Sequence, residues 1–277
     1  MPFAEINGFR MRYLAAAPSP AAAPGEARRG GAPVIFLHGL GSNADDWELQ
    51  VPAFSARYQT ISVDLRGHGQ SPYRGRLTVP AMAGDVARLL VELGGPAHVV
   101  GLSLGGAVAL ALGILFPEQV RSLTLVNTFA RYRPAGAGGV GRLARRLWLL
   151  AFGSRAALAG FIAAGLFPKP EQAPLRAATV ASLSRNARGT YWQALLAIRR
   201  FDARPGLGTL RCPTLVVLGD RDTTVPRAAG EALAAGIAGA RRVVIADSGH
   251  ATPIDQPEVF NHVVLDFLRS VDAGAPV

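Results

Sequence analysis

The sequence contains a single cysteine and lacks any long apolar run, and both absences limit what the protein can be. Cys212 has no partner in the chain, so an internal disulfide framework is excluded and a reducing compartment is expected. No apolar run approaches the roughly 20 residues of a membrane-spanning helix. The first residues, 1–13, also lack the apolar core of a signal peptide. We therefore expect a cytoplasmic protein without a membrane span.

The order of apolar runs predicts the fold class. The chain has 277 residues, of which 49% are hydrophobic, enough for one large domain with an insertion. Continuous apolar runs predict strands that are buried on both faces, and amphipathic patterns between them predict helices. This alternation predicts an α/β fold, a mostly parallel sheet with helices on both faces. The expected strands are 34–37, 60–63, 98–100, 122–126, 214–218 and 242–245, and the expected helices are 78–93, 104–116, 226–237 and 256–270.

The N-terminal segment predicts a hairpin followed by a loop. Asn7-Gly8 supplies the positive φ angles of a type I′ turn, so residues 3–14 are expected to form two antiparallel strands. Residues 15–33 are rich in Ala, Pro and Gly and include Arg28 and Arg29. Such a composition is typical of a loop.

The alternation of strand and helix stops between residues 128 and 208. We expect about four helices and no strand there, which predicts a helical insertion. The expected organisation is a core in two parts, 1–127 and 209–277, interrupted by this insertion. Turn-forming residues are expected to separate the helices at Gly138-Gly139, Gly153-Ser154, Pro168–Pro170 and Asn186–Gly189.

A serine stands in the strongest local motif, Gly101-Leu102-Ser103-Leu104-Gly105-Gly106. The motif follows an expected strand and opens an expected helix. A serine in such a sharp turn exposes its hydroxyl at the edge of the sheet, and the glycines allow close backbone packing. Ser103 is therefore the candidate nucleophile, with a Gly-rich structural turn as the alternative interpretation.

A serine hydroxyl needs a general base, and His250 is the best placed of five histidines. It follows the last expected strand, at the same carboxyl edge of the sheet as Ser103. His38 and His68 lie in glycine-containing turns and are expected to stabilise them. His98 precedes the strand that leads to Ser103, and His262 lies on the last helix.

An orienting acid and two oxyanion donors complete the candidate site. Asp220 and Asp222 both follow the strand 214–218, and composition alone does not separate them. A carboxylate there fixes the histidine tautomer. The backbone N–H groups of Leu104 and of Leu40, in the turn after the first parallel strand, are the expected oxyanion hole.

At these residues the sequence resembles the α/β-hydrolase superfamily over nearly the whole chain. His38-Gly39-Leu40-Gly41 resembles its oxyanion turn, and 64–71 resembles its structural Asp-x-Arg-Gly-x-Gly-x-Ser loop. Residues 219–226 resemble its acid loop, where the second aspartate belongs to the triad, which selects Asp222. Gly249-His250 resembles its histidine loop, and the insertion 128–208 matches its cap. The resemblance implies a hydrolase without cofactor or metal.

Within that superfamily, the chain is similar to 3-oxoadipate enol-lactonases and to pimeloyl-carrier-protein methyl esterases. Serine at position 103 differs from the aspartate of haloalkane dehalogenases and epoxide hydrolases. Ala251 follows His250 where carbon–carbon hydrolases that cleave meta-cleavage products often carry tryptophan. We therefore expect a carboxylic ester or lactone hydrolase. A carbon–carbon hydrolase and a ligand receptor on a hydrolase scaffold remain as alternatives.

Positive charge is concentrated in the insertion. Residues 128–208 carry twelve arginines and one lysine against one glutamate and one aspartate, a formal charge of +11, while the whole chain carries +10. Arg142, Arg145 and Arg146 are spaced three and four apart, on one helical face. Two interpretations remain open, a solvated helix face and the attraction of an anionic substrate or an acidic carrier protein. Nothing in the sequence forms a motif that reads nucleic acid.

Six aromatic residues also lie in the insertion. We expect most of them to pack the cap against itself and one or two to roof the substrate pocket. The sequence does not indicate which do so. They are Trp148, Phe152, Phe161, Phe167, Tyr191 and Trp192.

Overall fold

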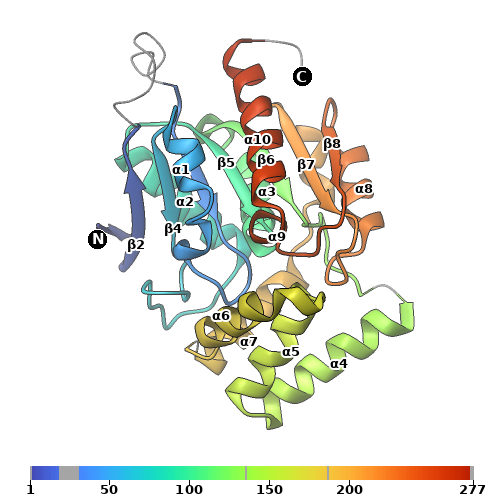
Figure 1. Cartoon of the computed structure of the whole chain (residues 1–277). Coiled ribbons are helices and arrows are strands. Elements are labelled where there is room, and N and C mark those ends of the chain that lie inside the picture. The colour runs from blue at the N-terminus through green and yellow to red at the C-terminus, as the bar shows by residue number, and fades with distance from the viewer. Residues whose placement is uncertain (1, 19–30, 135, 186, 275–277) are drawn as a thin grey trace.

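The computed structural model describes residues 2–18, 31–134, 136–185 and 187–274. Within these residues one eight-stranded sheet, in the order β1-β2-β4-β3-β5-β6-β7-β8, forms the centre of the molecule (Figure 1). Strands β3 to β8 are parallel, whereas β1 and β2 run antiparallel at one edge. The predicted α/β fold is thereby confirmed. The strands are β1 (Phe3–Ile6), β2 (Phe9–Ala16), β3 (Val34–Leu37), β4 (Thr60–Val63), β5 (Ala97–Leu102), β6 (Val120–Val126), β7 (Thr214–Gly219) and β8 (Arg241–Ile245).

The predicted hairpin is present, but its second strand is longer than expected. Asn7 and Gly8 have φ angles of 46° and 80°, as a type I′ turn requires. β2 continues to Ala16 because Ala15 and Ala16 pair with β4. Hydrogen bonding to β4 therefore makes these two residues part of a strand, although their composition is typical of a loop. Residues 19–30 of the expected loop, which include Arg28 and Arg29, lie outside the described residues.

Two layers of helices cover the faces of the sheet. Helices α1 (Val51–Ser55) and α10 (Pro257–Asp272) pack on one face, and α2 (Val79–Glu92), α3 (Leu104–Leu115) and α8 (Arg227–Ala235) pack on the other (Figure 1). Successive strand residues point to opposite faces, so that Val34 and Phe36 contact the first layer and Ile35 and Leu37 contact the second. Both faces of β3 are therefore buried, as its continuous apolar run predicts.

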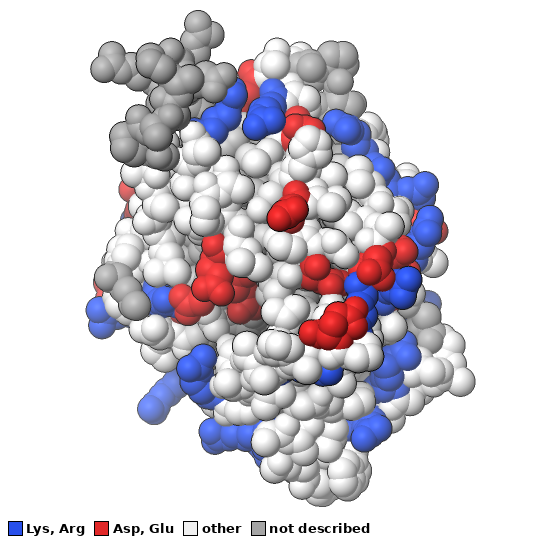
Figure 2. Space-filling view, viewed as in Figure 1, with Lys and Arg blue, Asp and Glu red and all other residues white. Residues whose placement is uncertain are grey.

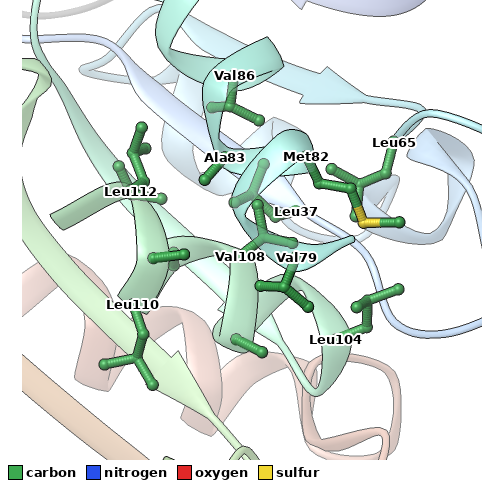
Figure 3. Packing of buried hydrophobic residues seen from close by; sticks show 14 of the residues in the cluster. Leu37, Leu65, Val79, Met82, Ala83, Val86, Leu104, Val108, Leu110 and Leu112 are labelled. Carbon is green, nitrogen blue, oxygen red and sulfur yellow. The ribbon is translucent and has the colours of Figure 1, made fainter. Parts of the chain in front are cut away.

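The contact between α2 and α3 shows how this packing follows from sequence. The Thr78 side chain accepts a hydrogen bond from the Ala81 N–H at 3.2 Å and so caps the start of α2. Apolar residues then recur every three or four positions on the buried side. Figure 3 shows Val79 beside Val108 of α3, with Ala83 and Val86 farther along α2. Each large side chain buried in this way stabilises the fold by about 1.5–3 kcal/mol.

Four helices are inserted between β6 and β7 in the described part of the chain, which confirms the predicted helical cap. They are α4 (Gly136–Phe152), α5 (Arg155–Leu166), α6 (Ala173–Leu183) and α7 (Arg188–Arg200). They lie beyond the edge of the sheet, at the lower end of the molecule in Figure 1. The two chain segments that connect the cap to the core meet at an isolated antiparallel bridge between Arg131 and Asp202, where the Ala203 N–H donates to the Ala130 carbonyl oxygen at 2.8 Å.

One expected helix break is wrong. Gly138 and Gly139 lie inside α4 and do not separate two helices. Gly139 is buried against Pro134, and a Cβ there would lie 3.2 Å from the Pro134 carbonyl carbon. The Gly153-Ser154 break is present, and the Ser154 hydroxyl caps α5 by accepting from the Ala157 N–H at 3.0 Å.

Several short elements have no counterpart in the sequence prediction, because each is too short to show a helical period. They are α1, α9 (Thr252–Asp255) and the 3₁₀ helices η1 (Ala44–Trp47), η2 (Pro117–Gln119), η3 (Pro170–Gln172) and η4 (Arg204–Thr209). In the segments that the structure describes, no helix has both the length and the apolar character needed to cross a bilayer.

Candidate active site

Ser103 stands at the junction between β5 and α3. Its φ of 56° and ψ of −110° lie in a region that residues other than glycine rarely adopt. The Ser103 N–H donates to the Val126 carbonyl oxygen at 2.9 Å, and the Thr128 hydroxyl donates to the Ser103 carbonyl oxygen at 2.7 Å. The surrounding structure therefore holds a conformation that costs on the order of 1–3 kcal/mol.

The glycines around Ser103 are required by close backbone approach. A Cβ on Gly101 would lie 2.4 Å from the Gly105 carbonyl oxygen, and a Cβ on Gly105 would lie 2.1 Å from the Leu37 carbonyl oxygen. Any larger residue would force α3 away from β5 and β3. The spacing in the sequence motif thus has a steric cause.

His250 and Asp222 form a buried hydrogen-bonded pair. The His250 Nδ1 lies 2.7 Å from the Asp222 Oδ2, and the two side chains are 6% and 3% exposed. The other carboxylate oxygen of Asp222 accepts from the Thr224 and Val225 N–H groups at 2.7 and 3.0 Å. This pairing keeps the proton on Nδ1 and leaves Nε2 as the ring's proton acceptor.

Asp220 takes a different position. It is exposed, and its carboxylate accepts from the Ser248 N–H at 3.1 Å. The structure thus brings Asp222, and not Asp220, to His250.

Ser103 and His250 open onto one cavity of about 1020 Å³ between the edge of the sheet and the cap. Phe161 and Phe167 of the cap line the same space. Within the described residues, His250 is hydrogen-bonded to Asp222 but not to Ser103. Such contacts are often long without substrate and shorten when substrate binds.

Leu104 and Leu40, the two residues predicted to supply oxyanion donors, lie near Ser103. Leu104 is the first residue of α3, where a helix leaves its N–H groups without an intrahelical partner. Leu40 lines the cavity and follows Gly39, where a Cβ would lie 3.7 Å from the Ser103 Cβ. The Gly39 carbonyl oxygen accepts from His38 Nδ1 at 2.7 Å. Because C=O and N–H point in opposite directions in a trans peptide, this bond turns the Leu40 N–H away from His38.

A family model for the alpha/beta hydrolase family matches residues 34–263. The chain belongs to the alpha/beta hydrolase family. It is therefore a hydrolase, and its sheet, cap and serine turn are those expected of this family.

Named relatives of this hydrolase cover most of its length. It is 32% identical over 243 residues to a pimeloyl-[acyl-carrier protein] methyl ester esterase of Neisseria meningitidis, covering 86% of this chain and 94% of that protein. It is 34% identical over 256 residues to a putative carbamate hydrolase of Azorhizobium caulinodans, covering 87% and 93%. The crystal structure of the enol-lactonase from Burkholderia xenovorans LB400 aligns with a TM-score of 0.84 at 28% identity, covering 97% and 100%.

Asn127 holds the histidine loop of this hydrolase, and the sequence reasoning missed it. Its side chain is buried and donates to the His250 carbonyl oxygen at 2.7 Å and to the Thr252 hydroxyl at 2.8 Å. Its Oδ1 accepts from the Gly219 N–H at 2.8 Å. Asn127 thereby connects the carboxyl ends of β6 and β7 to the loop of His250. Its place directly after a predicted strand was the available signal.

The cap is fastened to the same loop by polar contacts. Lys169 Nζ lies 2.7 Å from the Asp247 carboxylate, and the Gln172 side chain donates to Asp255. Asp255 in turn accepts from the Gly249 N–H at 2.7 Å. These bonds couple the position of the cap to the backbone that carries His250.

The other histidines of this hydrolase lie away from the cavity, as expected. His38 Nε2 accepts from the Leu65 N–H at 3.1 Å, and His68 Nδ1 donates to the Arg66 carbonyl oxygen at 3.2 Å. Burial lowers the pKa of His38 to about 4 and the pKa of His68 to about 3. Both rings are therefore neutral at pH 7 and stabilise their turns.

We expect these buried histidines to make stability depend on pH. In the unfolded chain both would titrate near pH 6.5, so unfolding takes up a proton at each as the pH falls below about 6.5. Each proton taken up on unfolding lowers the free energy of unfolding by about 1.4 kcal/mol per pH unit.

His68→Gln should therefore reduce the slope of the unfolding free energy against pH by about 1.4 kcal/mol per pH unit between about pH 6 and 4. Urea denaturation at several pH values measures this slope, and His262→Gln, at an exposed site, is the control. An unchanged slope in His68→Gln would contradict the assignment.

Arginines and an unexpected carboxyl group give the cavity its electrostatic character. Arg142, Arg145 and Arg146 line it from α4, so the predicted basic face meets the cavity. Arg146 donates to the Tyr191 hydroxyl, which fixes its head group. On the core side, Asp46 accepts from the Ser42 hydroxyl, and burial raises the pKa of Asp46 to about 7. In Figure 2, acidic side chains lie on the core side of the hollow and basic ones on the cap side.

The expectation for the cap aromatics is wrong for half of them. Phe161, Phe167 and Tyr191 are buried or half-buried in the cap, and the first two also roof the cavity. Three others remain exposed to solvent instead of packing the cap. They are Trp148 (58% exposed), Phe152 (78%) and Trp192 (42%).

Proposed function

We propose that this hydrolase cleaves a carboxylic ester or lactone through an acyl-enzyme, with Ser103 as nucleophile, His250 as general base and Asp222 as the orienting acid. One observation carries the proposal. The strained turn of Ser103 and the buried His250–Asp222 pair open onto the same cavity, which is large enough for a small-molecule substrate. The names of the relatives, a methyl ester esterase and an enol-lactonase, support the substrate class.

The proposed reaction begins when Ser103 Oγ attacks the carbonyl carbon and His250 Nε2 takes its proton. The carbonyl oxygen becomes an oxyanion, which accepts from the Leu40 and Leu104 N–H groups. Loss of one such donor typically costs about 3–4 kcal/mol of transition-state stabilisation. His250 then gives the proton to the leaving oxygen, and an ester of Ser103 remains.

A water molecule completes the cycle. His250 takes its proton as the water oxygen attacks the ester carbonyl, and then returns that proton to Ser103 Oγ as the acid leaves. The Asp222 carboxylate orients the ring and stabilises the imidazolium. In a lactone the leaving oxygen remains attached to the acid, so the product is a single hydroxy acid or its keto form.

The test is a substrate panel with purified protein. It contains short activated esters, enol-lactones, a carrier-protein methyl ester and a carbamate, the last because one relative is named a putative carbamate hydrolase. We expect turnover of at least one ester or lactone and acylation of Ser103 seen by mass spectrometry. Turnover of carbamates alone, or no acylation of Ser103 by any compound, would reject the proposal.

The cavity arginines favour substrates that carry a negative charge. Arg142, Arg145 and Arg146 contribute three positive charges to the lining of the cavity onto which Ser103 opens. Their attraction for an anion fades with salt, because the screening length is about 8 Å at physiological ionic strength. A solvated surface alone would show no such preference.

We therefore expect kcat/KM for an anionic ester to fall severalfold as salt rises, while kcat/KM for a neutral ester of similar size stays nearly constant. Arg142→Gln with Arg145→Gln should reproduce this selective loss at low salt. Arg211→Gln, an exposed arginine outside the cap, is the matched control. Equal responses of the two esters would leave the arginines as a solvated surface.

A further inference from the structure

Helix α4 presents an apolar face to solvent, and no element of the described chain covers it. Val140, Ala144, Trp148 and Phe152 follow one another at intervals of four residues, so they lie on one side of the helix. All four side chains are exposed to solvent. The exposed fraction is 57% at Val140, 58% at Trp148 and 78% at Phe152. We call this surface the α4 outer face. The Trp148 and Phe152 rings lie 6.2 Å apart, so their exposed surfaces are contiguous.

The opposite side of α4 already supplies the packing of the cap. Leu143, Leu149 and Leu150 are buried, and the latter two cluster with Leu158 and Leu195 of α5 and α7. The outer aromatics are therefore not needed to hold the cap together. Large exposed apolar patches on a protein surface mark interaction sites.

The border of the α4 outer face is basic and carries no acid. Between residues 136 and 166 the chain has four arginines and no aspartate or glutamate. Arg145 and Arg155 are exposed beside the outer face, whereas Arg142 is exposed on the side of α4 that lines the cavity. Figure 2 shows blue side chains around a white lower end of the molecule, with no red side chain on that end of this view.

We propose that the α4 outer face docks on the surface of a membrane that contains anionic lipids. An interfacial helix of this kind places Trp and Phe at the level of the headgroups and Arg against lipid phosphates. Each basic residue near an anionic surface contributes attraction that adds to the apolar insertion. The helix lies along the outer side of the cap, away from the sheet, so a flat surface can approach it (Figure 1).

Charge also argues against a second copy of this chain as the occupant. Two such faces in a symmetric dimer would bring together two caps of formal charge +11 each, and like charges repel.

Helix α4 also lines the substrate cavity, through Arg142 and Leu143 on its other side. Docking would therefore bring a wall of the substrate cavity close to the lipid surface.

Sedimentation with lipid vesicles tests the proposal. Full-length protein is mixed with vesicles of phosphatidylcholine, or with vesicles of equal parts phosphatidylcholine and phosphatidylglycerol. We expect binding to the second kind only, and weaker binding in high salt. Trp148→Ser with Phe152→Ser should weaken that binding by about tenfold or more, since two large apolar side chains no longer insert.

Matched variants distinguish binding through the α4 outer face from nonspecific binding through other exposed apolar residues. Val91→Ser with Leu115→Ser removes two apolar residues that are 55% and 51% exposed on α2 and α3, and it should bind as the wild type does. Arg155→Gln, at the border of the outer face, should weaken binding to a smaller extent. Turnover of a soluble neutral ester should be unchanged in the Trp148 and Phe152 variant, because neither side chain lines the cavity.

Four results would overturn the proposal. These are binding to neither kind of vesicle, equal binding to both, unchanged binding of the Trp148 and Phe152 variant, and concentration-dependent dimerisation that this variant abolishes. The last result would identify a second copy as the occupant. Binding of an acidic protein that depends on Trp148, without vesicle binding, would identify a protein partner instead. Vesicle binding can be measured with Ser103→Ala, so its outcome is independent of the proposed hydrolytic function.

Discussion

Replacing Ser103 with alanine is expected to abolish nearly all ester turnover, with a fall in kcat on the order of 10⁶-fold if chemistry limits the rate. The reason is that the variant lacks the Ser103 Oγ, the proposed attacking atom, and no other hydroxyl stands at the start of α3 to replace it. The fold should survive. The Ser103 N–H donates to the Val126 carbonyl oxygen and the Ser103 carbonyl oxygen accepts from the Thr128 hydroxyl, so neither bond uses the Ser103 side chain. The Ser103 hydroxyl makes no hydrogen bond within the described residues.

Kinetics on the best substrate of the panel measure the effect, and thermal denaturation checks the fold. Ser62→Ala is the matched control, because the Ser62 hydroxyl is also buried without a partner but lies in β4, away from the cavity. It should keep wild-type turnover. Turnover of Ser103→Ala within tenfold of the wild type would remove Ser103 from the mechanism. Loss of folding in both variants would show that the serines act through packing alone.

Asp222→Asn is expected to lower kcat by roughly 10⁴-fold without unfolding the protein. The asparagine Oδ1 can still accept from the Thr224 and Val225 N–H groups. Its amide then faces His250 Nδ1 as a donor. The ring would respond by accepting at Nδ1 and carrying its proton on Nε2, where it can no longer take the proton of Ser103.

Asp220→Asn is the matched control, because Asp220 is two residues away on the same loop but contacts the Ser248 backbone and not His250. It should change kcat far less. Steady-state kinetics of both variants on the same substrate decide between the two aspartates. A larger loss in Asp220→Asn would mean that the assignment of the acid is reversed.

The architecture was largely predictable because it follows from local patterns. Continuous apolar runs identified the parallel strands, and their ends placed Ser103, Asp222 and His250 near one edge of the sheet. The carboxyl ends of neighbouring parallel strands meet there by topology. Short elements such as α1 were missed, since five residues do not show a helical period.

Contacts between distant segments were not predictable in the same way. Asn127 joins β6 and β7 to the histidine loop across more than 90 positions of sequence. Burial raises the pKa of Asp46, helped by the charges of Asp45, Glu48 and Asp64, and Asp64 comes from the end of β4 and not from the loop of Asp46. The apolar spacing of α4 indicates which residues share a side, but not which side faces the cap.

The sequence by itself determined the order of strands and helices, the turn around Ser103 and the place of the helical insertion. These depend on residues within about ten positions of each other. Composition left Asp220 and Asp222 open, the family resemblance selected Asp222, and the structure brings Asp222 to His250. Only the tertiary structure decided that the α4 arginines reach the cavity and that Trp148 and Phe152 face solvent. The physical reason is that such facts depend on how separate elements are oriented after packing. That orientation follows from the burial of many side chains at once, and no single local pattern contains it.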